Sequence, residues 1–133
     1  AWKEKQPDVL VVEGQGSLLN PAYPGGYEIL AAARPDLIIL QHAPARKEYD
    51  GFPGYQIHPL EKQIQAIEII SDKPVVAITL HHENLRAKDI KKEMDKIMNK
   101  IHLPVFDLLL HGADELSQLV LSKITSVKRY KKN

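Results

Sequence analysis

Runs of apolar residues alternate along the chain with segments in which apolar residues recur every three or four positions. Four of the runs begin at or just after a proline: Val9 to Val12, Leu37 to Leu40, Val75 to Leu80, and Val105 to Leu110. Proline is tolerated at the first residue of a strand, and near-continuous Val, Ile and Leu runs are typical of parallel strands covered on both faces. The pattern therefore predicts four strands of a central, parallel sheet.

The segments between these runs predict helices that bury one face. A short helix is expected over residues 26–34, and longer ones are indicated by Ile57, Leu60, Ile64 and Ile67, by Ile90, Met94, Ile97 and Ile101, and by Leu116, Leu119, Val120, Ile124 and Val127. Pro59 suits the first position of its helix, where a missing N–H costs nothing. Alternating strands and helices predict an α/β fold, with an open, mostly parallel sheet flanked by helices and joined by right-handed crossovers. No linker or repeat interrupts the 133 residues, so we expect a single domain over 1–133.

The first predicted strand, Val9 to Val12, is too apolar for an exposed sheet edge. Another strand should pair with it, and we expect that strand to come from residues upstream of Ala1. The sheet is thus expected to be incomplete at its N-terminal side, with the N-terminal remainder of the same protein as a partner.

The composition narrows the choice of partners. With 44% hydrophobic and 26% charged residues, the chain has the make-up of an ordinary globular domain. Its 18 basic and 17 acidic residues give a net charge of +1, which favours neither nucleic acid nor a membrane as a partner. The absence of cysteine and of a long apolar run leads us to expect a cytoplasmic protein. The sequence leaves open whether it forms a homo-oligomer.

The strongest chemical signal is the turn that follows the first predicted strand, Glu13-Gly14-Gln15-Gly16-Ser17. The carboxyl ends of parallel strands are where open α/β sheets bind ligands, and glycines let backbone amides approach an anion. We expect Glu13 to be a catalytic residue and a magnesium ligand, Gly14 and Gly16 to contact a cofactor, and Gln15 and Ser17 to contact the substrate. The alternative is a plain tight turn, with Glu13 capping a helix or pairing with a base.

The segment 41–59 is long for a connection in an α/β unit, and such loops are commonly functional. His42, at the tip of the second predicted strand, is a candidate catalytic base. Arg46 can hold a carboxylate or phosphate with two hydrogen bonds, and Tyr49 and Asp50 are candidate substrate contacts. Hydrogen bonding within the loop, or simple surface exposure, is the competing explanation for each.

The third predicted strand ends in His81, His82, Glu83 and Asn84. Glu83 and Asn84 are candidate substrate contacts, with capping of the next helix as the alternative. The histidine spacing does not match a zinc motif. The chain also contains no G-x-x-x-x-G-K-[ST], G-x-S-x-G or G-x-G-x-x-G sequence, so hydrolase and dinucleotide-binding functions lack their signatures. Asp114 is expected to cap the last helix.

Four short segments together resemble a known family: the apolar strand with EGQGS at 9–17, Asn20-Pro21-Ala22-Tyr23, QHAPAR at 41–46, and Tyr49-Asp50-Gly51. They are similar to the C-terminal P-loop domain of domain-of-unknown-function family 1611, over nearly the whole chain. The resemblance implies a P-loop NTPase-like fold, in which Glu13 matches the acid on the metal side. Some members are described as D-glutamate N-acetyltransferases, which implies a small acidic metabolite as substrate and magnesium with ATP or acetyl-CoA as cofactors.

Two functions from different classes follow. The first is part of an enzyme acting on a small acidic metabolite with a nucleotide or acetyl-CoA, the chain alone being inactive because it lacks the phosphate-loop motif. The second is a nucleotide-responsive binding or regulatory module without catalysis.

Overall fold

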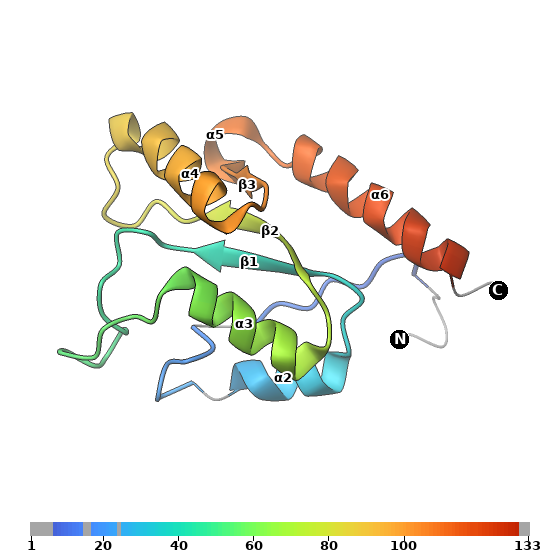
Figure 1. The fold of residues 1–133 in the computed structure, drawn as a ribbon, viewed down its shortest axis with the longest axis horizontal. Coiled ribbons are helices and arrows are strands. Elements are labelled where there is room, and N and C mark those ends of the chain that lie inside the picture. The colour runs from blue at the N-terminus through green and yellow to red at the C-terminus, as the bar shows by residue number, and fades with distance from the viewer. Residues whose placement is uncertain (1–6, 15–16, 24, 131–133) are drawn as a thin grey trace.

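The computed structural model describes residues 7–14, 17–23 and 25–130, and side chains as far as residue 124. Helices and strands alternate along the chain, in the order seen in Figure 1. The elements are α2 (Gly25–Ala33), β1 (Ile38–His42), α3 (Leu60–Ser71), β2 (Val75–Leu80), α4 (Ala87–Ile101), β3 (Val105–Phe106), α5 (Leu108–His111) and α6 (Asp114–Tyr130). No helix in this described part is long and apolar enough to cross a bilayer.

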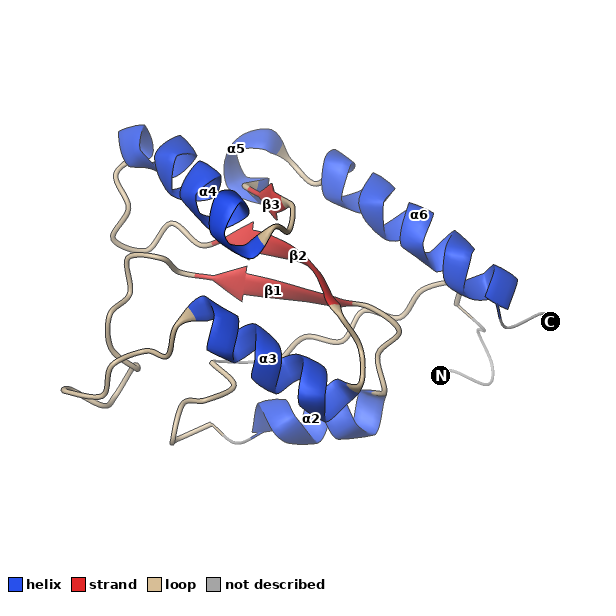
Figure 2. Ribbon diagram, viewed as in Figure 1, coloured by secondary structure: helices blue, strands red, loops and turns tan. Residues whose placement is uncertain are grey.

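The three strands form a parallel sheet in the order β1-β2-β3. Residue His42 of β1 lies opposite Leu80 of β2, and Ile78 of β2 lies opposite Val105 of β3. Both crossovers run in the same direction across the sheet, and because such connections are right-handed, α3 and α4 lie on the same face (Figure 2). The structure thus confirms an α/β fold with an open, parallel sheet and flanking helices.

The core lies between β2 and the two crossover helices. All six residues of β2 are buried, and Ile78 is 0% exposed. The buried apolar cluster consists of Ile38, Leu60, Ile64, Ile67, Val75, Ile78, Leu80, Ile90, Ile97 and Val105. These are the positions at which the helical spacing and the strand runs predicted burial, and their packing fixes the carboxyl ends of the strands relative to one another.

The helix boundaries follow local chemistry. Pro59 (φ −51°, ψ 145°) precedes the first residue of α3 instead of occupying it, so the helix begins one position later than predicted. Asp72 and His102, with φ of 54° and 59°, end α3 and α4 in the left-handed conformation, and their N–H groups donate to the carbonyls of Glu68 and Met98. This is a common way for a helix to stop.

The predicted strand at Val9 to Val12 is wrong for the structure as described, because this segment belongs to no strand. Its four side chains are 44%, 66%, 84% and 50% exposed. A strand needs a neighbour with free N–H and C=O groups as well as a suitable sequence. No described strand pairs with this segment.

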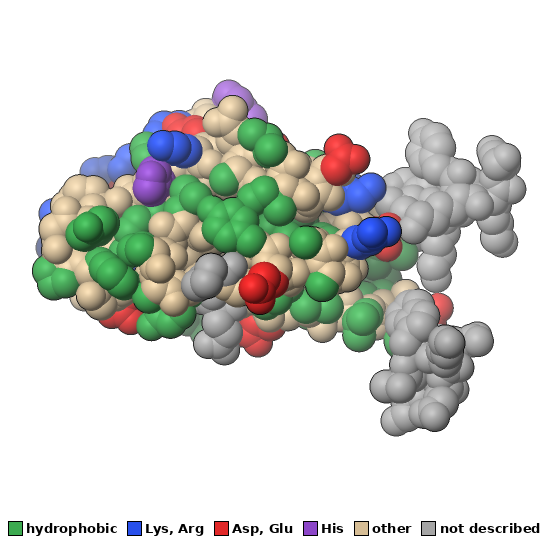
Figure 3. Space-filling view, turned by 90° about the horizontal axis from the view of Figure 1, so that it is seen from below, with side chains coloured by type: hydrophobic (Ala, Val, Ile, Leu, Met, Phe, Trp, Pro, Cys, Tyr) green, Lys and Arg blue, Asp and Glu red, His purple; other side chains and the backbone are tan. Residues whose placement is uncertain are grey.

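Apolar surface also remains elsewhere. In the view from below, which is the side on which α2 lies, hydrophobic side chains gather over the middle of the face (Figure 3). Large apolar side chains that stay exposed include Tyr23, Ile39 and Ile69.

The predicted strand at Val105 to Leu110 is also wrong in its second half. Strand β3 ends at Phe106, and α5 begins two residues later. The cause is Asp107, whose Oδ1 accepts hydrogen bonds from the N–H groups of Leu109 (3.1 Å) and Leu110 (3.2 Å). An aspartate in this position starts a helix, whatever the apolar run that follows it would favour.

Candidate functional site

The carboxyl ends of the three strands gather polar residues at one edge of the sheet. Strand β1 ends at His42, β2 is followed by the turn 81–84, and β3 is followed by Asp107. The N–H of His81 donates to the carbonyl of His42 (2.8 Å), so β1 and the turn stay in register beyond the last strand residue. Ligands of open α/β sheets bind at this edge.

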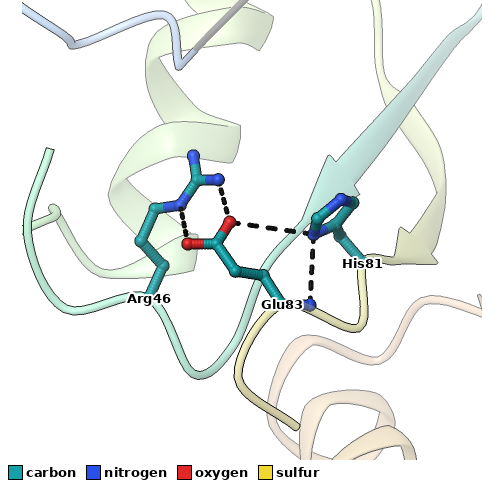
Figure 4. A network of polar contacts seen from close by, with 3 residues as sticks. All are labelled: Arg46, His81 and Glu83. Atoms are coloured by element: carbon teal, nitrogen blue, oxygen red, sulfur yellow. Dashed lines mark hydrogen bonds and ion pairs between the residues drawn. The ribbon is translucent and has the colours of Figure 1, made fainter. Parts of the chain in front are cut away.

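Arg46 and Glu83 form a two-pronged ion pair across this edge (Figure 4). Arg46 Nε donates to Glu83 Oε1 (3.2 Å), while the second guanidinium nitrogen contacts Oε2. Each side chain keeps about a third of its surface exposed, at 35% and 32%. The hydrogen bond raises the pKa of Arg46 and lowers the pKa of the Glu83 carboxyl, so both groups are charged. The guanidinium is thus held in the two-bond arrangement by which arginine recognises carboxylates.

His81 extends this pair. Its Nδ1 lies 3.9 Å from Glu83 Oε2 and accepts a hydrogen bond from the N–H of Glu83 at 3.3 Å (Figure 4). His81 therefore helps to fix the orientation of Glu83.

A cavity of about 450 Å³ opens beside Arg46 and Glu83 and is lined on its other side by residues 48–53. Its size lies in the range usual for small-molecule sites. The structure thereby brings together four residues that the sequence put forward: Arg46, Tyr49, Asp50 and Glu83. The charge of Asp50 further favours the protonated form of Arg46, raising its pKa.

The loop after β1 is held in place by hydrogen bonds between its own residues. Tyr49 is 4% exposed, and its hydroxyl lies 2.6 Å from His58 Nδ1. Its N–H donates to the carbonyl of Tyr55 (3.0 Å), and Glu48 and Gln56 form an antiparallel bridge. The Tyr49 hydroxyl is therefore engaged within the loop, and its contact with a substrate stays a prediction.

His42 lies at the end of β1, on the face covered by α4. Burial lowers the pKa of His42, and the carboxylate of Glu93 on α4 acts in the opposite direction with the smaller effect. The imidazole is therefore neutral at neutral pH, as a proton acceptor must be. Its catalytic role remains a prediction.

A second histidine lies against a buried carboxylate. His82 Nε2 is 2.8 Å from Asp107 Oδ2, and Asp107 is 1% exposed. The sequence interpretation missed Asp107 because it lay inside a predicted strand. The signal that could have revealed it is an acid within an apolar run, next to a histidine-bearing turn on the neighbouring strand.

The turn after residue 12 is described in part. Gln15 and Gly16 lie outside the described residues, while Glu13 and Gly14 are exposed. The hydroxyl of Ser17 is buried, and within the described structure it has no hydrogen-bond partner. Neither Glu13 nor Ser17 lines the cavity beside Arg46.

Asn84 was predicted to contact the substrate, and it lies in the turn after β2. Asn84 has φ of 58° in a turn closed by the hydrogen bond from the N–H of Leu85 to the carbonyl of His82 (2.9 Å). Asparagine tolerates this left-handed conformation, so the turn alone accounts for an asparagine at this position.

Over the described residues, no three His, Asp or Glu side chains come together in a way that could hold a metal ion.

Comparison with known proteins gives one family. Residues 1–117 match the DUF1611 C-terminal P-loop domain, a domain of unknown function. A D-glutamate N-acetyltransferase from Tritonibacter scottomollicae is 29% identical over 112 residues, covering 80% of this chain and 34% of that protein. Another D-glutamate N-acetyltransferase, from a Pseudoalteromonas species, is 26% identical over 113 residues, with the same coverage of 80% and 34%.

A crystal structure shows the same fold. A DUF1611 family protein from Anabaena variabilis superimposes with a TM-score of 0.78 at 26% identity, over 92% of this chain and 36% of that one. The chain thus spans about a third of the length of its curated relatives and of this structure.

Proposed function

Because the chain belongs to the DUF1611 family, as its C-terminal P-loop domain, we propose that it forms part of an enzyme that acetylates the amino group of a small acidic amino acid. The two curated relatives are named for D-glutamate, which is the substrate we propose here, with acetyl-CoA as the acetyl donor. We also propose that an N-terminal remainder of the same protein completes the site.

The observation that carries this proposal is the Arg46 guanidinium, which faces a cavity and already binds one carboxylate in a two-bond geometry. A substrate carboxylate is chemically equivalent to that of Glu83 and would compete with it for Arg46. The pair is about one-third exposed, so this exchange does not require the core to open.

The binding of the substrate carboxylate by Arg46 can be tested by steady-state kinetics. The protein to use joins this chain to the proposed remainder. Arg46→Lys keeps the charge but loses the planar fork, so the KM for D-glutamate should rise about 10- to 100-fold. The KM for acetyl-CoA should stay within about threefold, because the fork is assigned to the carboxylate of the amino acid.

The matched control is Arg86→Lys, because Arg86 also pairs with a carboxylate, Asp89 (2.5 Å), but on the exposed start of α4. It should leave both KM values unchanged. An unaltered KM for D-glutamate in Arg46→Lys would show that Arg46 does not bind the substrate. Absence of acetyl transfer in the unsubstituted protein would reject the function itself.

We assign the cofactor side of the site to the turn at 13–17. Glu13 offers an exposed carboxylate, and the unpartnered Ser17 hydroxyl fits a nearby polar ligand. Magnesium commonly takes one or two carboxylates together with phosphate oxygens, so Glu13 would hold it beside the phosphates of ATP or acetyl-CoA. The magnesium would neutralise phosphate charge, while Gly14 and Gly16 would let backbone amides approach.

The P-loop description of the family also supports a second candidate, a nucleotide-responsive module without catalysis. Calorimetry with magnesium-ATP, acetyl-CoA and D-glutamate, followed by product analysis of each sample, separates the two. Binding of ATP with no acetylated product in any mixture would favour the regulatory module.

A further inference from the structure

We propose that His82 and Asp107 form a catalytic dyad, in which His82 Nδ1 accepts the proton released when the substrate amine attacks the acetyl donor. This inference rests on the proposed function. It assigns the proton-accepting group, which neither the relatives' names nor the family description specifies.

The hydrogen bonds of Asp107 fix the tautomer of His82. Asp107 Oδ1 accepts from two N–H groups of α5, and Oδ2 lies 2.8 Å from His82 Nε2. An ionised carboxylate only accepts hydrogen bonds, so Nε2 must carry the proton of the pair. In the neutral imidazole the lone pair then lies on Nδ1, which becomes the basic atom.

The Nδ1 atom is available for this role. His82 keeps 24% of its side chain exposed, and no described residue donates to or accepts from its Nδ1. The side chain of Asp107 is 0% exposed, so its charge acts on His82 with little screening by water. The imidazolium that forms on proton transfer would therefore be stabilised by the carboxylate behind it.

The dyad is linked to the proposed substrate-binding arginine through the turn after β2, although neither His82 nor Asp107 lines the cavity beside Arg46. His82 and Glu83 are consecutive residues of the turn after β2, and Glu83 holds Arg46 at the cavity. The same turn thus carries both the proposed base and the group that orients the carboxylate-binding side chain.

His42 is the competing base, but it lacks an orienting partner of this kind. Burial lowers its pKa, and Glu93 acts on it through its charge, since no hydrogen bond joins the two side chains among the described residues. Over the described residues, His82 is the histidine whose ring bonds to a fully buried carboxylate; the carboxylate near His81 belongs to the partly exposed Glu83.

The proposed step balances with an acyl thioester and an amine as reactants. The neutral amine nitrogen attacks the thioester carbonyl carbon, a C–N bond forms, and the nitrogen loses a proton to His82 Nδ1. The tetrahedral intermediate then breaks its C–S bond, and His82 returns the proton to the thiolate sulfur. Asp107 touches no reactant and acts as a positioning residue.

Kinetics and NMR of the protein that joins this chain to its proposed remainder test the dyad. His82→Gln keeps a donor toward Asp107 but removes the base, so kcat should fall about 100-fold or more, while the KM for D-glutamate stays within about threefold. His102→Asn is the matched control, since asparagine tolerates its φ of 59° and the residue ends α4, at the opposite edge of the sheet. It should leave kcat unchanged.

Asp107→Asn tests whether Asp107 sets the tautomer of His82 or only stabilises the fold by capping α5. Its amide oxygen can still cap α5, but its NH₂ group would donate to His82 Nε2 and move the imidazole proton to Nδ1. Nitrogen-15 NMR should show this change of tautomer, and the rate should lose the pH dependence contributed by the base. If this variant does not fold, Asp107→Ser retains a helix cap without the carboxylate and serves in its place.

The outcomes separate the two levels of the proposal. Acetyl transfer by the unsubstituted protein with His82→Gln within about threefold of its kcat would overturn the dyad and leave the proposed function standing. A His82 ring protonated on Nδ1 in the unsubstituted protein would also overturn the dyad. No acetyl transfer by the unsubstituted protein would overturn both.

Discussion

At the scale of single residues, the ligand edge of the sheet holds two histidines in opposite settings. His42 is partly buried, and this burial lowers its pKa. His82 is partly exposed and hydrogen-bonded to the buried Asp107. The same side chain is therefore desolvated at one strand tip and held by a hydrogen-bonded partner at the next.

The His42 setting predicts how stability depends on pH. Its folded pKa lies below the ordinary value of 6.5, so between these two values the unfolded chain binds more protons. The free energy of unfolding should rise with pH through this window, by at most about 1.4 kcal/mol per pH unit. The contribution is present above about pH 6.5 and is lost as the pH falls through the folded pKa.

Urea unfolding at a series of pH values measures this slope. His42→Gln should flatten the stability curve just below about pH 6.5, and His102→Asn should not. The lowered pKa values of Glu61 and Glu83 act in the same direction, but below their ordinary value of 4.5, so they fall outside this window. An unchanged slope in His42→Gln would contradict the assignment.

At the scale of elements, the helices were predictable because each one carries its own periodic pattern. Helices α2, α3, α4 and α6 lie where the apolar spacing placed them. The two strand predictions that failed depended on information outside the segment. Val9 to Val12 lacks a described strand to pair with, and Val105 to Leu110 was cut short by a side-chain cap at Asp107.

The same reasoning explains what was predictable at the site. Arg46 was put forward from the long loop after one predicted strand and Glu83 from the turn after the next, because ligands of open α/β sheets bind at the carboxyl ends of the strands. The pairing of His82 with Asp107 depends on where β3 ends, and the predicted strand ran past Asp107 to Leu110 because its apolar residues outweighed the single acid among them. Tyr49 could be put forward from its loop, but its burial against His58 follows from the folded loop alone.

The loop between β1 and α3 yields a stability prediction for an element without regular structure. Tyr49→Phe keeps the ring but leaves His58 Nδ1 without its partner, which should lower the free energy of unfolding by about 1–2 kcal/mol. Tyr55→Phe makes the same chemical change at a residue that is 61% exposed and should cost less than about 0.5 kcal/mol. Equal effects of the two substitutions in urea unfolding would show that the buried hydrogen bond does not hold the loop.

At the scale of the whole molecule, the described fold leaves strongly apolar side chains uncovered at 9–12. Scattered apolar surface residues are normal in soluble proteins, but four consecutive ones in a β-favouring sequence mark a surface that another segment can cover. The proposed N-terminal remainder would do so by supplying a neighbouring strand. Segment 9–12 would then become a strand of the sheet, and Glu13, which follows it, would lie at the end of the sheet where the other strands also have their carboxyl ends.

Val11, at 84% exposure, is the residue with which to test this arrangement. In the chain alone, Val11→Lys should change the free energy of unfolding by less than about 0.5 kcal/mol, because the side chain already faces solvent. In the longer protein, the same lysine would be placed between packed layers, and the loss should exceed about 2 kcal/mol. Ile69→Lys, at a residue 73% exposed on α3, is the matched control and should be tolerated in both proteins. Equal tolerance of Val11→Lys in both would mean that the segment stays uncovered, and a strand supplied by the remainder would then be excluded at this position.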